Sequence, residues 1–228
     1  MGAGAASGAG KAKRMPRAVR EQQMLDAAVR IFGRRGYRAA SMDEIAEVAG
    51  VSKPLVYLYL NSKEELFTAV IRREARALVS AVRAGAEPKA PADARLWAGL
   101  RAFFLHTAEN PDGWSVLHRQ ARTHGEPFAA EVTVMREEMV AFVTLLIAAA
   151  AREAHSSEPE LASRDVGGLA QALVGAAESL ADWANATEGV SAKEAAATLM
   201  NFAWVGLGKL REGERWMPGG MPGGMLGG

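Results

Sequence analysis

Apolar residues recur at helical spacing along almost the whole chain. In residues 17–34, Leu25, Val29 and Phe32 fall three or four positions apart and would share one helix face. β-branched residues are sparse, no stretch alternates apolar and polar residues, and the breaks beyond residue 83 carry Gly or Pro. The pattern predicts an all-α protein with helices over 17–34, 41–48, 52–59, 63–83, 92–109, 113–123, 127–154, 162–187 and 191–211.

The segment 40–66 carries an unusually dense set of helix start and stop signals. Ser41 is an N-cap residue, and Glu44 three positions later would complete a capping box. Gly50 follows the apolar face of that short helix, at a point where a sharp turn favours a residue that tolerates positive φ. The first predicted helix of this segment therefore ends in a tight turn.

Two further helices are predicted to follow that turn, one after the other. Ser52 would cap the first of them, and Pro54 lies in its first turn, where a missing N–H costs nothing. Ser62 would cap the next, again with a glutamate, Glu65, three residues later. Helix, glycine turn and helix together form the arrangement that places a second helix in the major groove of DNA.

This segment resembles the tetracycline-repressor (TetR) family of bacterial transcriptional regulators. The resemblance implies a three-helix DNA-binding domain over 17–62 and a larger helical domain over 63–216 that binds a small effector and dimerises. The residues that carry it are Ile31-Phe32-Gly33, Gly36-Tyr37, Ser41-Met42-Asp43-Glu44-Ile45-Ala46, Ala49-Gly50-Val51-Ser52-Lys53, Val56-Tyr57, Tyr59 and Ser62-Lys63-Glu64-Glu65-Leu66.

The recognition helix must bury one face and present the other to DNA. Val56 and Leu60, four residues apart, are expected in the core. Leu55 stands where the family more often has a small or hydroxylated residue, so direct base readout is expected to be sparse. Asp43 is expected to turn away from the phosphates. With the family resemblance, the predicted DNA contacts are Ser41, Met42, Ser52, Lys53, Pro54, Leu55, Tyr57, Tyr59 and Lys63.

The charge is unevenly distributed along the chain. Through Lys63 there are eleven Lys or Arg against five Asp or Glu, whereas the remainder has sixteen against twenty-one. The first part therefore has the positive potential of a DNA-facing module, and the second part does not. Residues 1–16 are expected to form a disordered basic arm, serving either solubility or minor-groove contact, and the tail 217–228 is also expected to be disordered.

Composition limits the remaining function classes. The chain has 228 residues and no cysteine, which excludes disulfides and thiolate metal sites, and no apolar stretch is long enough to span a membrane. No cofactor or metal motif is present, and the four histidines lack the spacing of a helical metal site. We therefore expect a cytoplasmic protein that is not an enzyme; a DNA-binding architectural protein without an effector is the alternative.

The last two long helices are expected to form a homodimer, as the resemblance implies, and burial within one monomer is the alternative for their apolar faces. A two-fold dimer would bind a roughly palindromic operator. Ligand binding would release a repressor from that operator. The predicted dimer contacts are Leu169, Ala172, Leu173, Ala176, Leu180, Leu199, Met200, Ala203, Trp204 and Leu207.

The effector is expected to bind between the connecting helix over 63–83 and the helices over 92–154, and core packing is the alternative role for each large side chain there. The predominance of apolar groups favours an apolar or aromatic small molecule. The candidate ligand contacts are Trp97, Phe103, Phe104, His106, Trp114, His118, Met139, Phe142, Gln171, Glu178 and Trp183.

Overall fold

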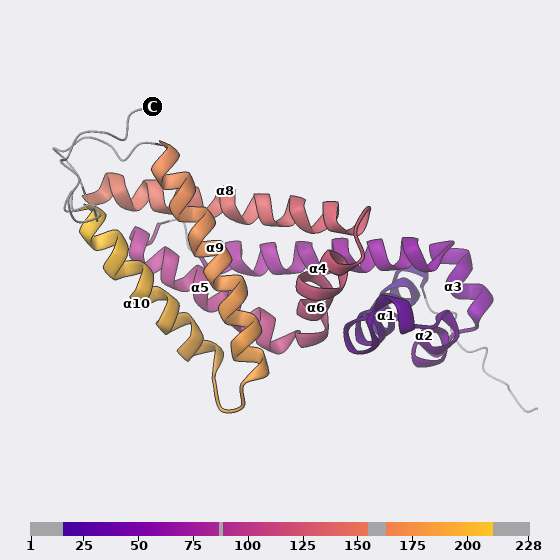
Figure 1. Ribbon diagram of the computed structural model, residues 1–228. Helices are drawn as coiled ribbons and strands as arrows, with labels where there is room; N and C mark the ends of the chain where they lie inside the picture. Colours follow the sequence, from indigo (N-terminus) through magenta and orange to yellow (C-terminus); the bar gives the residue numbers. More distant parts are fainter. Residues whose placement is uncertain (1–15, 87–88, 155–162, 212–228) are drawn as a thin grey trace, which may run out of the picture.

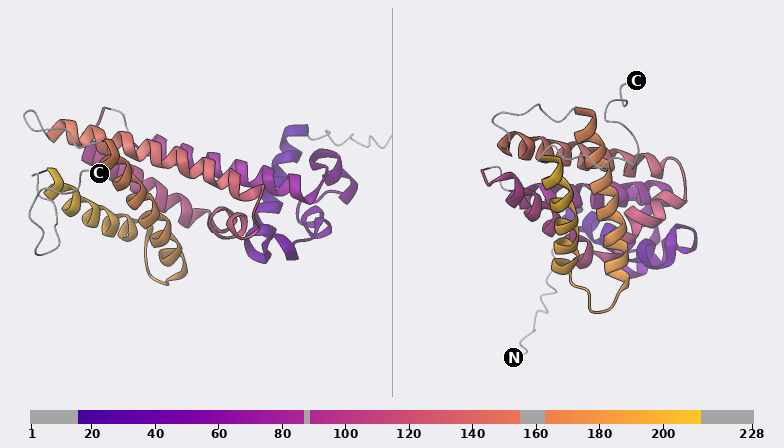
Figure 2. Two further views of the ribbon diagram at one scale, coloured as in Figure 1. Left: turned by 45° about the horizontal axis from the view of Figure 1, so that its top comes forward. Right: turned by 60° about the vertical axis from the view of Figure 1, so that its left-hand side comes forward.

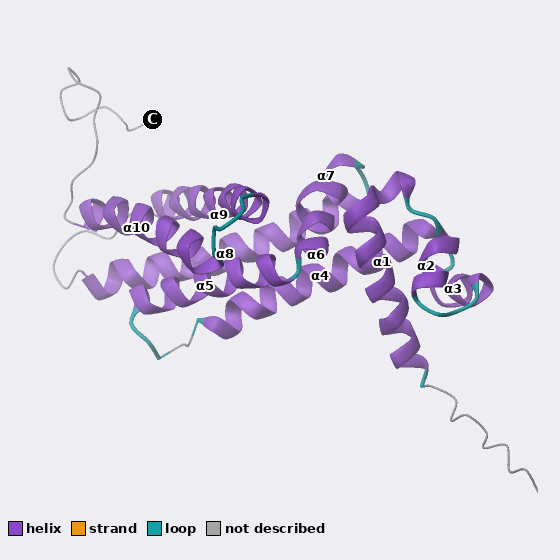
Figure 3. Cartoon of the chain, turned by 90° about the horizontal axis from the view of Figure 1, so that it is seen from below, coloured by secondary structure: helices purple, strands orange, loops and turns teal. Residues whose placement is uncertain are grey.

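The computed structural model of the chain describes residues 16–86, 89–154 and 163–211, and every regular element in them is a helix, as Figure 3 shows. The all-α fold predicted from the sequence is confirmed. The helices are α1 (Arg17–Ala39), α2 (Met42–Val48), α3 (Lys53–Leu60), α4 (Lys63–Gly85), α5 (Ala92–Glu109), α6 (Pro111–Ser115), the π-helical η1 (Val116–Gln120), α7 (Ala121–Thr123), α8 (Phe128–Ala154), α9 (Ser163–Ala186) and α10 (Ala192–Arg211).

Most helix boundaries lie within two residues of those predicted, and two regions differ. The first helix does not end at residue 34, as predicted, but continues to Ala39, with a break at Gly36, where φ is 80°. The helix predicted over 113–123 is instead α6, η1 and α7, so a π-helical turn interrupts it. Periodicity alone could not reveal this turn, because one extra residue in a turn barely changes the apolar pattern.

The molecule is elongated, with α1, α2 and α3 at one end and the other long helices extending away from them (Figure 1). α4 starts beside α3 and runs along the body next to α5 and α8. α9 and α10 pack on α8 and α5, and Figure 2 shows both helices far from the α1–α3 end. α4 therefore links the two ends of the protein as one continuous rod.

One hydrophobic core runs from the α1–α3 end into the helical body. At the junction, Phe67 of α4 packs against Phe32 of α1 and Phe128 of α8, with ring centroids 4.8 Å apart in both pairs. Tyr37 joins the same cluster, 4.7 Å from Phe67. This aromatic cluster holds the end of α1 against α4 and α8. The α1–α3 end and the helical body are therefore packed against each other through shared side chains.

A second contact joins the α1–α3 end to the body through α6. Gly33 of α1 lies so close to α6 that an added Cβ would come within 2.6 Å of the Asp112 carbonyl oxygen. The Ser115 hydroxyl donates to the Gly33 carbonyl at 2.9 Å, and Arg34 forms an ion pair with Asp112 at 3.1 Å. The glycine at position 33 is therefore needed for close approach between helices.

No helix in the described residues is long and apolar enough to cross a membrane. The predicted arm over 1–16, apart from Pro16, and the predicted tail over 217–228 lie outside the residues that the structure describes.

Candidate functional site

The start of α2 and the turn between α2 and α3 have the geometry that the sequence predicts. The Ser41 hydroxyl accepts a hydrogen bond from the Asp43 N–H at 3.1 Å and caps α2. Gly50 has a φ of 65°, which few side-chain-bearing residues adopt. The capping box predicted at Glu44 is replaced by another contact, because its carboxylate forms an ion pair with Arg35 at 2.8 Å. α2 is thereby tied to α1.

The recognition helix α3 buries the two residues predicted to face the core. Val56 is fully buried and Leu60 nearly so, whereas Lys53, Pro54 and Tyr57 are exposed. Ser52 lies at the N-cap, but its side chain makes no capping hydrogen bond, contrary to the prediction. Its hydroxyl therefore stays at the exposed N-terminus of α3, where phosphates can be held.

Asp43 lies against α3 and forms an ion pair with Lys53 at 2.8 Å. Both side chains are largely exposed, and the hydrogen bond from Lys53 to Asp43 raises the pKa of the lysine. The sequence led us to expect Asp43 turned away from DNA, but not that it would hold a predicted DNA contact. A phosphate or base must compete with this carboxylate for Lys53.

Met42 and Lys63 are less available than predicted. Met42 is only 6% exposed and belongs to the core, so its side chain offers no surface to DNA; this prediction was wrong because α2 packs its first turn on the other helices. Lys63 is half-buried: it donates to the Arg38 carbonyl at 3.2 Å and lies 4.8 Å from the centroid of the Tyr37 ring. Burial lowers the pKa of Lys63.

The other predicted contacts surround a residue that the sequence reasoning did not select. Leu55 and Tyr59 are partly buried, and the Arg17 guanidinium lies 4.9 Å from the centroid of the Tyr59 ring. Leu58 is 72% exposed, the highest exposed fraction of any large apolar residue in α1–α4. It lies two positions from both Val56 and Leu60, so its location opposite the buried face could have been read from helical periodicity.

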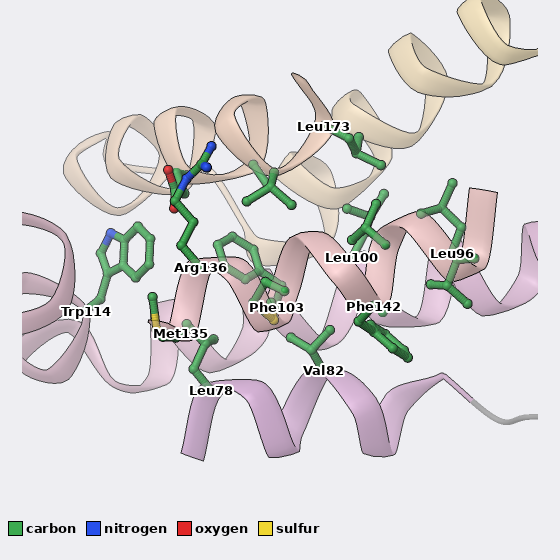
Figure 4. A pocket seen from close by; sticks show the side chains of 17 residues that line it. Leu78, Val82, Leu96, Leu100, Phe103, Trp114, Met135, Arg136, Phe142 and Leu173 are labelled. Carbon is green, nitrogen blue, oxygen red and sulfur yellow. The ribbon is translucent and has the colours of Figure 1, made fainter. Parts of the chain in front are cut away.

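A mostly apolar cavity lies between α4, α5, α8 and α9 (Figure 4). It encloses about 50 Å³. An internal cavity of about 150 Å³ can hold benzene, so the space here is small by comparison. Its walls are formed by Leu78, Val82, Leu96, Gly99, Leu100, Phe103, Trp114, Met135, Arg136, Met139, Phe142, Val143, Leu146, Leu173, Val174, Ala177 and Glu178.

Five of the predicted ligand contacts line this cavity, namely Phe103, Trp114, Met139, Phe142 and Glu178. The other six lie elsewhere. Phe104 is buried in the core, Trp97 packs against the core from its edge, and Trp183 is 53% exposed on α9. His106 lines a separate polar groove that also includes Glu109. The helical pattern places each residue on a face, but it does not show which faces leave space between them.

His118 and Gln171 lie close behind the cavity wall. The His118 ring stacks on Trp114 with centroids 4.9 Å apart, and its Nδ1 lies 3.5 Å from Asp182. Burial, followed by the positive charge of Arg122, lowers the pKa of His118. Burial of the ring therefore favours the neutral form of the imidazole.

Arg136 was absent from the predicted ligand contacts, yet it lines the cavity. Its guanidinium donates to the Gln171 side-chain oxygen at 2.6 Å and lies 3.5 Å from the Glu178 carboxylate. Arg122 of α7 contacts the same carboxylate at 3.0 Å. An arginine among the apolar positions of α8 was the available sequence signal.

The predicted dimer residues divide into two buried residues, seven at least partly exposed residues and Leu207. Leu173 lines the cavity and Leu199 is 3% exposed, so both are buried within one monomer and their assignment to the interface was wrong. Both face inward because α9 and α10 also cover this chain's own core. The side chain of Leu207 lies outside the described residues. The remaining residues are partly or fully exposed: Leu169, Ala172, Ala176, Leu180, Met200, Ala203 and Trp204.

The largest exposed apolar side chains of α9 and α10 include one that the sequence reasoning did not select. Phe202 is 76% exposed, and Trp183, predicted as a ligand contact, is 53% exposed. In the described residues, no group of three or more histidines or carboxylates is placed to hold a metal ion. A capped helix-turn-helix with an exposed outer face, joined by one rod to a helical body with an apolar cavity, defines a DNA-binding protein of the regulator class.

Comparisons with known proteins agree with this geometry. The family model of bacterial regulatory proteins of the tetR family matches residues 24–70, and the tetracyclin repressor-like C-terminal domain matches residues 92–206. The chain is 34% identical over 204 residues to the HTH-type transcriptional activator FasR of Mycolicibacterium smegmatis, and the match covers 89% of each chain.

Solved structures give the same result. A TetR-like transcriptional regulator from Rhodococcus sp. RHA1 superposes with a TM-score of 0.73 at 37% identity, covering 86% of this chain and 99% of that one. FadR from Bacillus subtilis in complex with stearoyl-CoA has the same fold, with a TM-score of 0.62 at 16% identity over 80% of this chain and 96% of that one. The chain belongs to the TetR family, and it is a DNA-binding transcriptional regulator of the helix-turn-helix type.

Proposed function

We propose that the protein is a cytoplasmic homodimeric repressor that binds a palindromic operator and is released from it by a small apolar effector. The observation that carries this proposal is the position of α4. Leu78 and Val82 of this helix line the cavity, whereas Leu66 and Phe67, near its other end, are buried in the core shared with α1. Any shift of α4 at the cavity therefore reaches the DNA-binding end.

The small size of the cavity means that a bound effector would have to displace the walls of the cavity. At about 50 Å³ it cannot hold even a small aromatic ring without expanding. An effector must therefore separate the helices around the cavity to enter, and we propose that α4 is one of those displaced. The effector-bound and DNA-bound arrangements then differ in packing, and the difference in effector affinity between them couples the two sites.

The exposed face of α9 and α10 supports dimerisation. Along α9, Gly168, Ala172, Ser179 and Trp183 are exposed and fall close to one helical stripe, and Phe202 adds a large apolar surface on α10. Covering these side chains with a second copy would remove an exposed apolar patch from water. A two-fold dimer would present two recognition helices to successive major grooves.

The cavity lining favours an elongated apolar effector. FadR of B. subtilis, a protein of the same fold, holds stearoyl-CoA, so this fold accommodates a long acyl chain. The relative FasR is named as an activator, so a relative with 34% identity does not by itself set the direction of regulation for this chain. We propose repression for an operator that overlaps the promoter.

Selection of bound duplexes from a random pool tests the proposal. We expect a roughly palindromic sequence whose half-sites lie about ten base pairs apart or a multiple of that spacing. Replacing Tyr57 with alanine should weaken binding to the selected duplex by about tenfold. The matched control is Val134→Ala, which removes an exposed apolar side chain on α8. Enrichment of no sequence, or equal affinities for the two variants, would contradict the proposal.

A further inference from the structure

The cavity has one charged end. Its lining is apolar apart from Arg136 and Glu178, and Figure 4 shows Arg136 near the Trp114 end, with Leu96 and Phe142 toward the opposite end. A charged side chain against an apolar cavity is costly unless its charge is compensated. The partners of Arg136 therefore indicate what the cavity is built to receive.

The charge of Arg136 is only partly compensated. Its shortest contact, 2.6 Å, is to the neutral amide oxygen of Gln171. Among the residues that the structure describes, its one carboxylate partner is Glu178, at 3.5 Å, and Arg122 holds the same carboxylate at 3.0 Å. Asp182, one turn further along α9, faces His118 instead. Two guanidinium groups thus share one carboxylate at this end of the cavity.

We propose that the effector ends in a carboxylate that binds Arg136 and replaces Glu178, which remains paired with Arg122. This inference rests on the proposed effector function of the cavity. In the bound state each guanidinium would have a carboxylate of its own, and charge-assisted pairs of this kind are among the stronger hydrogen bonds in proteins. The apolar part of the effector would extend from Arg136 toward Leu96 and Phe142.

The exposure of this end fits a charged group. The side chain of Arg136 is 32% exposed and that of Glu178 is 12% exposed, so this end of the cavity approaches the surface. A carboxylate there would keep part of its hydration, whereas the apolar chain would be removed from water. The effector class is therefore an amphipathic carboxylic acid with a long apolar body.

The test compares three ligands with the same chain, dodecanoate, dodecanol and dodecanoyl-CoA, by calorimetric titration of the full-length protein. We expect Arg136→Gln to weaken dodecanoate binding by about tenfold or more, the loss of a hydrogen bond between charged groups, and to change dodecanol binding little. Arg72→Gln is the matched control, because Arg72, like Arg136, pairs with a glutamate, in this case Glu131 of α8, but does not line the cavity.

Glu178→Gln keeps the test decisive if the Arg136→Gln variant is damaged in its folding. It removes the competing carboxylate and should strengthen dodecanoate binding several-fold, a gain that structural damage would not produce. Equal effects of Arg136→Gln on dodecanoate and dodecanol would overturn the inference. So would a loss of affinity confined to dodecanoyl-CoA, which would assign the site to a thioester. If the unmodified protein bound none of the three ligands, the proposed effector function would fail as well.

Discussion

The aromatic cluster around Phe67 and the lining of the cavity belong to one hydrophobic core and use the same kinds of side chains, yet they pack differently. Phe67 is fully buried and contacts three other aromatic rings, on Phe32, Tyr37 and Phe128. Around the cavity, Phe103, Met135 and Phe142 leave a space of about 50 Å³. The same helix, α4, passes through both regions. A filled core transmits displacement, and an incompletely filled core can absorb a ligand, so the difference suits an effector-controlled protein.

The largest expected effect comes from emptying the filled core. Phe67→Ala should lower the free energy of unfolding by about 3–5 kcal/mol, because a large cavity would replace the ring contacts. Phe142→Ala, at the edge of the existing cavity, should cost clearly less, since its side chain is partly exposed. Urea unfolding measures both. Equal losses would show that the two cores are packed to the same degree.

A second prediction concerns the contact between α1 and α6. Gly33→Ala should lower the free energy of unfolding by about 1–3 kcal/mol, because the added Cβ would clash with the Asp112 backbone, only 2.6 Å away. α6 would have to move off α1, and the hydrogen bond from Ser115 would be strained. Urea unfolding measures this loss. An unchanged midpoint would mean that the contact between these helices is loose.

A glycine-to-alanine substitution at the cavity should change the free energy of unfolding in the opposite direction. Gly99 lies in α5 and lines the cavity, and an added Cβ would meet only Val82, at an ordinary 3.8 Å. Gly99→Ala should raise the free energy of unfolding by about 0.5–1 kcal/mol through helix propensity alone. Thermal unfolding of this variant beside Gly33→Ala gives the comparison directly. Destabilisation by both substitutions would show that the space beside Gly99 is too small for an added methyl group.

The smallest expected effect is a pH dependence at the cavity end. Burial lowers the pKa of His118 below its ordinary value of 6.5, so the unfolded chain binds the proton more readily than the folded chain. Its contribution to stability is complete above about pH 6.5 and is lost as the pH falls through the region below that value.

Chemical unfolding at neutral and mildly acidic pH measures the effect of His118. His118→Gln should lose less stability on acidification than the unmodified protein. His106→Gln should act in the same direction, because burial lowers the pKa of that histidine too, although it lies in a separate groove. A loss on acidification that is the same with and without His118 would show that its ring is not desolvated.

The sequence by itself determined the helices and the DNA-binding turn. The residues that define them act locally: Ser41 and Ser62 cap helices, Gly50 takes positive φ, and Val56 and Leu60 share one face. Such signals depend on positions three or four apart, which the chain itself displays. The exposure of Leu58 follows from the same periodicity.

Only the tertiary structure decided the cavity and the pairing of charges. Leu173 and Leu199 looked like dimer residues because an apolar helix face does not reveal which neighbour will cover it. The contacts of Lys53 with Asp43 and of Arg136 with Glu178 join residues brought together by the packing of separate helices. Spaces and ion pairs between helices depend on distances across the fold, and helical periodicity carries no information about those distances.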